Sequence, residues 1–202
     1  RQRQMCIRDS VMSQQRATIY SQRSKVLDGE DVSKNIHDMM NTSIEEAVNM
    51  YCSDTVAENW NLDGLRSHFL NLYVMDSDLR YTTEELNDLT KKDIIDFLKE
   101  RGELIYKTRE ADMGSEAMRE VERVCLLKTV DRHWMDHIDA MDDLKQGIRL
   151  RAYANTDPVI AYKQESLTMF EDMISAIQGD TVRRIFSCLL YTSPSPRDAH
   201  ES

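Results

Sequence analysis

Residues 115–150 read SEAMREVERVCLLKTVDRHWMDHIDAMDDLKQGIRL, and this stretch decides the fold. Its apolar residues recur almost always in steps of three or four, the spacing that places them on one face of an α-helix. The residues on that face are Met118, Val121, Cys125, Leu127, Val130, Trp134, Ile138, Met141, Leu144 and Ile148. The sequence therefore predicts a single helix about 50 Å long, far longer than an average globular helix.

A polar turn at residues 151–157 follows this helix, and a second helix is predicted after the turn. Asp157 suits an N-cap, and Pro158 suits the first helical position, where the N–H that proline lacks has no helical partner. The apolar face of this helix consists of Ile160, Leu167, Phe170, Ile174, Ile177 and Ile185. Two long helices joined by a short turn lie antiparallel, so residues 115–186 are predicted to form a helical hairpin.

The chain before residue 115 also has helical patterns. Residues 11–27 and 31–52 each predict one helix, and residues 53–112 hold shorter amphipathic segments. The expected core of these shorter segments consists of Trp60, Leu65, Phe69, Leu72 and Phe97. Six Gly and three Pro are too few for the turns that many short strands need. We therefore expect an all-α fold: a truncated N-terminal helix, a small helical subdomain and a long antiparallel two-helix hairpin.

The two ends of the chain differ from the rest. Residues 1–10 and 187–202 have no amphipathic period, and both resemble translated sequencing adapter. We expect both to be non-native tails and leave them out of the fold prediction. A natural disordered tail is the alternative.

Composition excludes several classes of protein. The net charge of −10 argues against a general nucleic-acid binder, because binding phosphates requires a basic face. No apolar run approaches the roughly 18 to 20 residues that span a bilayer, and the N-terminus lacks the apolar core of a signal peptide. The four cysteines are isolated, which predicts neither a zinc knuckle nor a disulfide framework. The chain is therefore expected to be cytosolic.

The run from Leu126 to Phe170, LLKTVDRHWMDHIDAMDDLKQGIRLRAYANTDPVIAYKQESLTMF, is similar to the two-helix finger of the SecA family of bacterial preprotein translocase motors. The match proceeds almost position by position and includes Trp134, His137, Met141-Asp142, Gln146-Gly147-Ile148, Tyr153-Ala154, Asp157-Pro158 and Phe170. Residues 11–31 resemble the stretch where the family's long scaffold helix runs into its wing domain. Residues 33–112 match more loosely. Before Val11 the family usually has Tyr-Asp-Asp where this chain has Arg8-Asp9-Ser10, which favours a native sequence beginning near Val11.

The resemblance implies a division into domains and a function. Residues 11–30 are expected to be the end of the scaffold helix, 31–112 the helical wing and 113–186 the finger. The chain is then part of the ATP-driven machine that pushes unfolded preproteins through the SecY channel. Its implied partners are the SecY complex, the preprotein and the rest of the motor, without nucleic acid. Its implied place is the cytoplasm, peripheral at the inner face of the plasma membrane through partner and lipid.

Two signatures of the complete family are absent from this sequence. There is no G-x-x-x-x-G-K-[ST] loop to cradle phosphates, so the chain is not expected to hydrolyse ATP. The family's clustered Cys/His zinc ligands are also missing. We expect no catalytic residue, metal or cofactor in this chain, and assign ATP and magnesium to the full-length protein.

The candidate substrate contacts lie in the turn. By resemblance, Tyr153 is the fingertip aromatic that touches the polypeptide, and an aromatic ring with a polar tip presses on any sequence. The alternative is a turn aromatic that packs on its own hairpin. Its neighbours in the fingertip are Arg149, Leu150, Arg151, Ala152 and Asn155. The two arginines either contact the channel or substrate, or complement the helix dipole.

The remaining site residues are interpreted as structural. They are Trp134, Leu127, Met141, Ile148, Asp157, Pro158 and Phe170. His133 and His137 have the i,i+4 spacing of a metal pair, but Trp134 stands where zinc proteases place their glutamate, which favours helix packing. Two rival functions follow from these features: a free-standing helical adaptor whose hairpin binds a partner helix, and a metallohydrolase that uses the two histidines.

Overall fold

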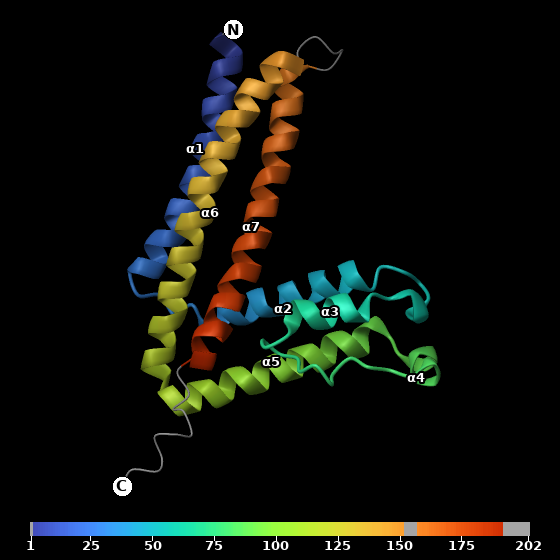
Figure 1. The fold of residues 1–202 in the computed structure, drawn as a ribbon. Helices are drawn as coiled ribbons and strands as arrows, with labels where there is room; N and C mark the ends of the chain where they lie inside the picture. Colours follow the sequence, from blue (N-terminus) through green and yellow to red (C-terminus); the bar gives the residue numbers. More distant parts are fainter. Residues whose placement is uncertain (1, 152–156, 192–202) are drawn as a thin grey trace. The chain divides into compact units, whose positions relative to one another are not determined.

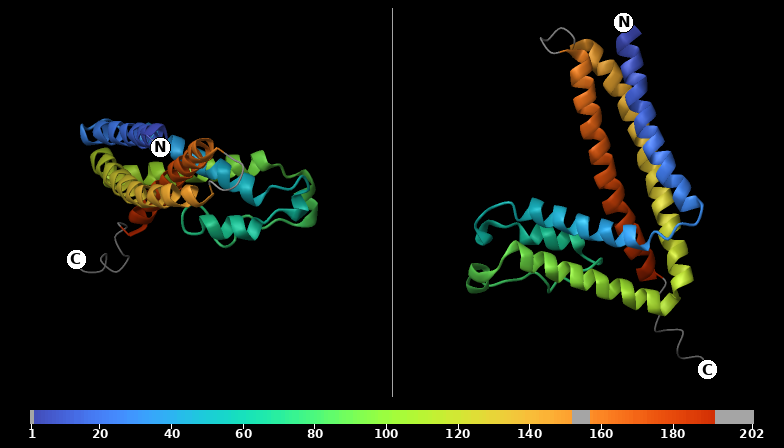
Figure 2. Two further views of the ribbon diagram at one scale, coloured as in Figure 1. Left: turned by 90° about the horizontal axis from the view of Figure 1, so that it is seen from above. Right: turned by 180° about the vertical axis from the view of Figure 1, so that it is seen from behind.

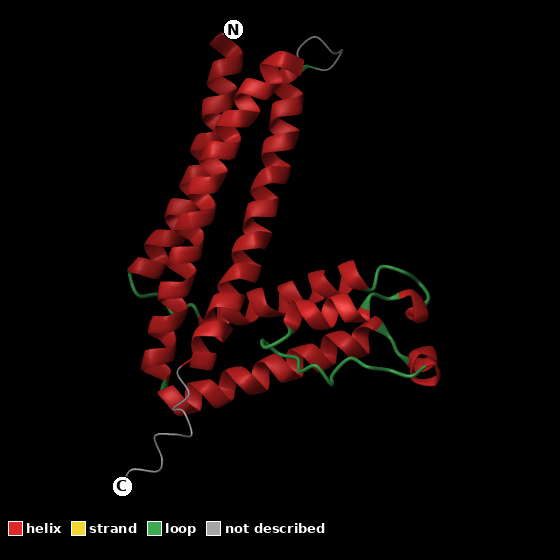
Figure 3. Ribbon diagram, in the orientation of Figure 1, coloured by secondary structure: helices red, strands yellow, loops and turns green. Residues whose placement is uncertain are grey.

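The computed structural model describes the backbone of residues 2–151 and 157–191, and the side chains of residues 10–148 and 157–188. Every regular element in these ranges is a helix, apart from an isolated bridge between Leu70 and Val74 (Figure 3). The elements are α1 (Gln2–Leu27), α2 (Ser33–Tyr51), η1 (Ala57–Asn59), α3 (Leu62–Phe69), α4 (Thr83–Asp88), α5 (Lys91–Met113), α6 (Ser115–Arg151) and α7 (Pro158–Tyr191). None of the described helices is apolar over a stretch long enough to cross a bilayer. The all-α fold class is confirmed.

The helices extend further into both ends of the chain than the sequence pattern indicated. α1 begins at Gln2, and α7 continues to Tyr191. The prediction that residues 2–10 and 187–191 lie outside the fold was therefore wrong. The physical reason is that a helix continues through residues of good intrinsic propensity, such as the Gln, Arg and Met at positions 2–5, even where no amphipathic period marks them. The native or non-native origin of these residues stays a prediction.

Contacts within the chain divide it into two compact units. The first, called here the three-helix unit, comprises residues 1–32 and 123–180, and the second, the short-helix unit, comprises residues 33–122 and 181–202. The first two turns of α6 and the last turns of α7 thus belong to the short-helix unit. This division differs from the predicted domain boundaries, which placed residues 113–186 together in the hairpin.

In the three-helix unit, α1 and α7 both lie beside α6 (Figures 1 and 2). The Arg23 guanidinium donates a hydrogen bond of 2.8 Å to the Asp131 carboxylate, and Gln15 contacts His137. Residue numbers therefore rise along α1 as they fall along α6, so these two helices are antiparallel. The ring of His137 also contacts that of Phe170, while Ile148 packs with Tyr162. α7 is thus antiparallel to α6, as the hairpin prediction requires.

In the short-helix unit, α2 packs mainly against α5 and also against α3. Each of these three helices contributes fully buried side chains: Ile44 and Val48 from α2, Leu65 from α3, and Ile94 and Leu98 from α5. Each of these side chains contributes about 1.5 to 3 kcal/mol when taken out of water. Capping boxes fix the starts of α4, through Thr82 and Glu85, and of α5, through Thr90 and Asp93.

Of the five predicted core residues in this unit, Leu65 and Phe69 are buried, while Trp60, Leu72 and Phe97 are only half-buried. The prediction was wrong for these three. Helix α3 ends at Phe69, because Leu70 has a non-helical ψ of 132° and Asn71 a positive φ of 63°, so Leu72 lies outside the helix. The Trp60 indole N–H donates to the Asp54 carbonyl, which keeps that ring at a surface loop.

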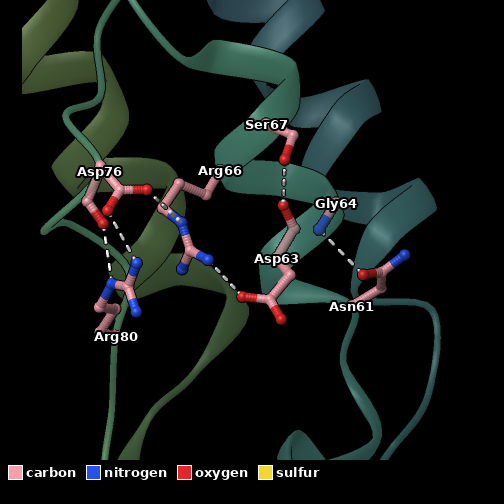
Figure 4. A network of polar contacts seen from close by, with 7 residues as sticks. All are labelled: Asn61, Asp63, Gly64, Arg66, Ser67, Asp76 and Arg80. Carbon is pink, nitrogen blue, oxygen red and sulfur yellow. Dashed lines mark hydrogen bonds and ion pairs between the residues drawn. The ribbon is translucent and has the colours of Figure 1, made fainter.

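A polar network surrounds α3 and the loop that follows it (Figure 4). The Asn61 side chain accepts a hydrogen bond of 2.9 Å from the Gly64 N–H and so caps the helix. Arg66 pairs with Asp63 and lies 3.9 Å from the Asp76 carboxylate, which also accepts a bond of 2.9 Å from Arg80. Charged contacts therefore tie the loop after α3 to the helix, in addition to the packing of the buried Tyr73 ring on Phe69.

Candidate functional site

The candidate site is the turn that joins α6 to α7. Ala152, Tyr153 and Asn155 lie outside the described residues, and so do the side chains of Arg149, Leu150 and Arg151, whose backbone forms the last turn of α6. The fingertip assignment therefore stays a prediction from the sequence. The described residues define what supports this turn.

An apolar cluster joins all three helices next to the turn. Met141 and Ile148 from α6 and Tyr162 from α7 are fully buried together. Val11, Met12, Leu144 and Met169 are half-buried and pack against them. Burying three large side chains contributes several kcal/mol, at about 1.5 to 3 kcal/mol each. The end of the hairpin is thus bound to α1 as well as held closed.

The start of α7 is fixed at Asp157 and Pro158. The Asp157 carboxylate accepts a hydrogen bond of 2.9 Å from the Val159 N–H, and its carbonyl accepts one of 3.1 Å from the Ala161 N–H. Pro158 is the first residue of the helix. A side-chain cap of this kind contributes about 1 kcal/mol to helix stability. The cap determines where the turn gives way to α7.

A group of rings lies further along the hairpin. Trp134 is only 5% exposed, and its ring centroid lies 5.6 Å from that of His137. Phe170, half-buried on α7, meets His137 edge to face at 5.8 Å. Leu127, the other predicted structural residue of α6, is also half-buried. The structure therefore brings both Trp134 and Phe170 into contact with one histidine.

A chain of buried polar groups crosses the same layer. The Gln15 amide donates a hydrogen bond of 3.1 Å to the Ser166 carbonyl, so its oxygen faces the Nε2 of His137 at 2.8 Å. That nitrogen must carry the proton, because the amide oxygen accepts only. All three residues are buried. These hydrogen bonds fix α1, α6 and α7 in one axial alignment. Sliding any of the three helices would break a buried bond that no water replaces.

Burial has a second consequence for His137. Removing the ring from water disfavours the charged imidazolium, which lowers the pKa of His137 below its ordinary value. The histidine is therefore neutral at physiological pH, consistent with its role as a single donor to Gln15.

The metal-pair hypothesis can be compared with the positions of both histidines. The Nε2 of His133 lies 2.8 Å from the Asp180 carboxylate of α7, whereas that of His137 faces Gln15 of α1. The two nitrogens are thus engaged with different helices. Within the described residues, no group of three or more His, Cys, Asp or Glu side chains is placed to hold a metal ion.

One polar cluster of the short-helix unit was missed by the sequence interpretation. The Tyr106 hydroxyl donates to the fully buried Glu122 carboxylate, and Arg119 donates to Tyr106 and Glu110 at 2.6 and 2.7 Å. Burial and the bond to Glu122 raise the pKa of Tyr106. A signal was available, because Glu122 lies four residues after Met118 and therefore on the apolar face of α6. The same spacing places Ser166 between Tyr162 and Phe170 on α7.

Comparison with known proteins identifies close relatives for nearly the whole chain. Residues 2–188 match the family model of the SecA Wing and Scaffold domain. The chain is 46% identical over 190 residues to the protein translocase subunit SecA of Carboxydothermus hydrogenoformans, an alignment that covers 94% of this chain and 22% of that protein. It is also 46% identical over 179 residues to the SecA of Finegoldia magna, covering 89% of this chain and 19% of that protein. The chain therefore spans about a fifth of the length of these relatives.

Proposed function

This chain belongs to the SecA family, and from that membership we propose that it is the wing and scaffold part of a motor that moves unfolded preproteins through the SecY channel. The observation that carries the proposal is the alignment, at 46% identity over 94% of the chain, to a protein translocase subunit. The ordered match from Leu126 to Phe170 supports the finer assignment, in which the hairpin is the two-helix finger and Tyr153 its contact with the preprotein.

The construction of the hairpin supports a mechanical role. A part that transmits displacement has to resist bending and sliding. The cluster around Ile148 and Tyr162 holds the two hairpin helices together, and the Gln15 bonds fix both to α1. Movement of α1 would then be carried to the turn over a helix of about 50 Å, because the buried bonds resist sliding.

The chemical cycle is assigned to other parts of the motor. The sequence contains no phosphate-binding loop, so ATP and magnesium would be bound by the remaining four-fifths of a full-length protein of the family. The proposed partners of this chain are the SecY complex, the preprotein and those motor domains. Its proposed place is the cytoplasmic face of the plasma membrane, reached through the partner and lipid.

The fingertip assignment is tested in a complete motor. Residues 11–186 replace the matching segment of the Carboxydothermus hydrogenoformans relative, and transport of an unfolded secretory precursor is measured in vesicles that contain the SecY complex. We expect Tyr153→Ala to lower the transport rate at least fivefold, which corresponds to about 1 kcal/mol of lost contact. Nucleotide binding by the same variant is expected to stay unchanged.

The matched control is Tyr20→Ala, which removes an exposed tyrosine of α1. It is expected to transport at the rate of the parent chimera. Equal transport by the Tyr153 and Tyr20 variants would remove the fingertip assignment. An inactive parent chimera, despite normal folding and nucleotide binding, would contradict the translocation role itself.

A further inference from the structure

The short-helix unit contains an open groove of about 1030 Å³. Its walls come from three segments: the loop after α3 at residues 70–76, the middle of α5, and the end of α7. This volume lies at the upper end of the range for ligand sites, roughly 300 to 1000 Å³. The groove is therefore large enough to hold several side chains of a peptide.

Much of the groove wall is apolar and open to solvent. Leu70, Met75 and Leu104 are 40%, 65% and 62% exposed, respectively, and all three line it. Leu72, Val74 and Ile105 complete the aliphatic lining. Large apolar side chains gathered around a concavity are typical of an interaction surface, whereas single exposed ones carry no such meaning.

Two hydrogen-bond donors of the residues that line the groove have no partner among the described residues. The one carboxylate in the lining, Asp76, is already held by Arg80 and Arg66 (Figure 4). Arg101 donates to Asp78, yet its Nε–H is buried without a partner among the described residues. The buried hydroxyl of Tyr73 likewise lacks a partner in the described part of the chain.

Arg183 is an exposed cation of this groove. It lies on α7, and within the described ranges no carboxylate pairs with it. Its positive charge acts together with the larger effect of burial to lower the pKa of the neighbouring His68. The residues that line the groove thus carry a local excess of positive charge and of hydrogen-bond donors, whereas the chain as a whole has a net charge of −10.

We propose that this groove binds a peptide segment that combines large apolar side chains with a carboxylate, the apolar side chains contacting Leu70, Met75 and Leu104 and the carboxylate pairing with Arg183. A carboxylate supplies a partner for the exposed Arg183 guanidinium, and charge-assisted hydrogen bonds to a guanidinium are stronger than neutral ones. This surface involves none of the residues assigned to the fingertip, so it stands independently of the proposed translocation function.

Binding is measured by fluorescence anisotropy with the whole chain and a short labelled peptide of alternating leucine and glutamate. The comparison peptide has lysine in place of each glutamate. We expect saturable binding of the glutamate peptide, weakened by salt, and at least tenfold weaker binding of the lysine peptide. Arg183→Gln is expected to weaken binding about tenfold, the loss typical of a hydrogen bond to a charged group.

Two further variants make the assignment specific. Leu104→Ser removes an exposed apolar wall residue without touching the core, and is expected to weaken binding about fivefold. Lys107→Gln changes the net charge as Arg183→Gln does, but at an exposed position of α5 outside the groove lining, and is expected to bind normally.

Three outcomes would overturn the proposal: no saturable binding, equal binding of the two peptides, or equal effects of Arg183→Gln and Lys107→Gln. Sedimentation of the chain alone gives a further check. A dimer that Leu104→Ser dissociates would assign the groove to a second copy of the chain and contradict the peptide assignment.

Discussion

Gln15 has an unusual environment for an amide side chain, because it is buried between three helices. Its amide group donates to the Ser166 carbonyl and accepts from His137, so donor and acceptor are both used. A buried amide with a missing partner costs more than the bond itself contributes, since the abandoned group is left without water. The main effect of Gln15 is therefore to specify one alignment of the three helices. Its net contribution to the free energy of unfolding is the smaller effect.

We predict that Gln15→Leu destabilises the chain by about 1 to 3 kcal/mol, the cost of leaving the buried His137 N–H without an acceptor. Urea unfolding followed by circular dichroism measures the change.

The double variant Gln15→Leu/His137→Leu is the matched test, because it removes both partners at once. It is expected to cost less than the sum of the two single variants, since neither polar group is then left alone. Additive losses would mean that the two side chains do not interact in solution.

At the scale of elements, Gly114, which precedes α6, and Gly147, which lies within it, differ in whether their position requires glycine. Gly114 ends α5 with φ 88° and ψ 148°, a conformation that other residues adopt only with strain. Gly147 lies within α6, and a methyl group added there would meet nothing within 4 Å. The first glycine is required by the backbone conformation at the junction between α5 and α6, and the second is not required by packing.

Gly114→Ala is expected to lower the free energy of unfolding by about 1 to 3 kcal/mol, because the strain of the positive φ has to be accommodated. Gly147→Ala is expected to raise it by about 0.8 to 1 kcal/mol through helix propensity. Thermal unfolding of the two variants under identical conditions provides the comparison. A stabilised Gly114→Ala protein would show that the junction has a different backbone.

At the scale of the whole molecule, acid is expected to weaken the fold through the buried His137 and the half-buried His68. Burial is the main cause that lowers the pKa of both His68 and His137. The unfolded chain then binds more protons than the folded chain below the ordinary histidine pKa of about 6.5, so stability rises with pH in that range. Conversely, stability is lost as pH falls from about 6.5 towards the lowered values of the folded state.

We therefore predict a decrease in the free energy of unfolding between about pH 7.5 and about pH 5.5, worth about 1.4 kcal/mol for each unit of pKa difference. Chemical unfolding at a series of pH values measures it. The variant His68→Gln/His137→Gln is expected to show a flatter dependence across this range. An unchanged slope in that variant would assign the effect to other groups.

Much of the fold could be predicted locally. The helix from Ser115, the start of α7 at Pro158 and the capping box at Thr82 all depend on residues within about four positions of one another, which is the reach of helical hydrogen bonds and side-chain neighbours. The candidate site was predicted from the family resemblance. That resemblance assigned Tyr153 to the fingertip without information on which residues its side chain contacts. The half-buried state of Leu72 was not predictable in this way, because it depends on where α3 stops.

What the sequence by itself determined is the set of helices, their order and their family, since periodicity, caps and an ordered run of letters are all local properties. Only the tertiary structure decided that Gln15 is joined to His137 and Ser166, that Glu122 is buried against Tyr106, and that three separate segments form one groove. Those contacts link residues up to 151 positions apart. Which residues meet in these contacts depends on how the helices pack against one another. Local sequence patterns carry no information about that packing.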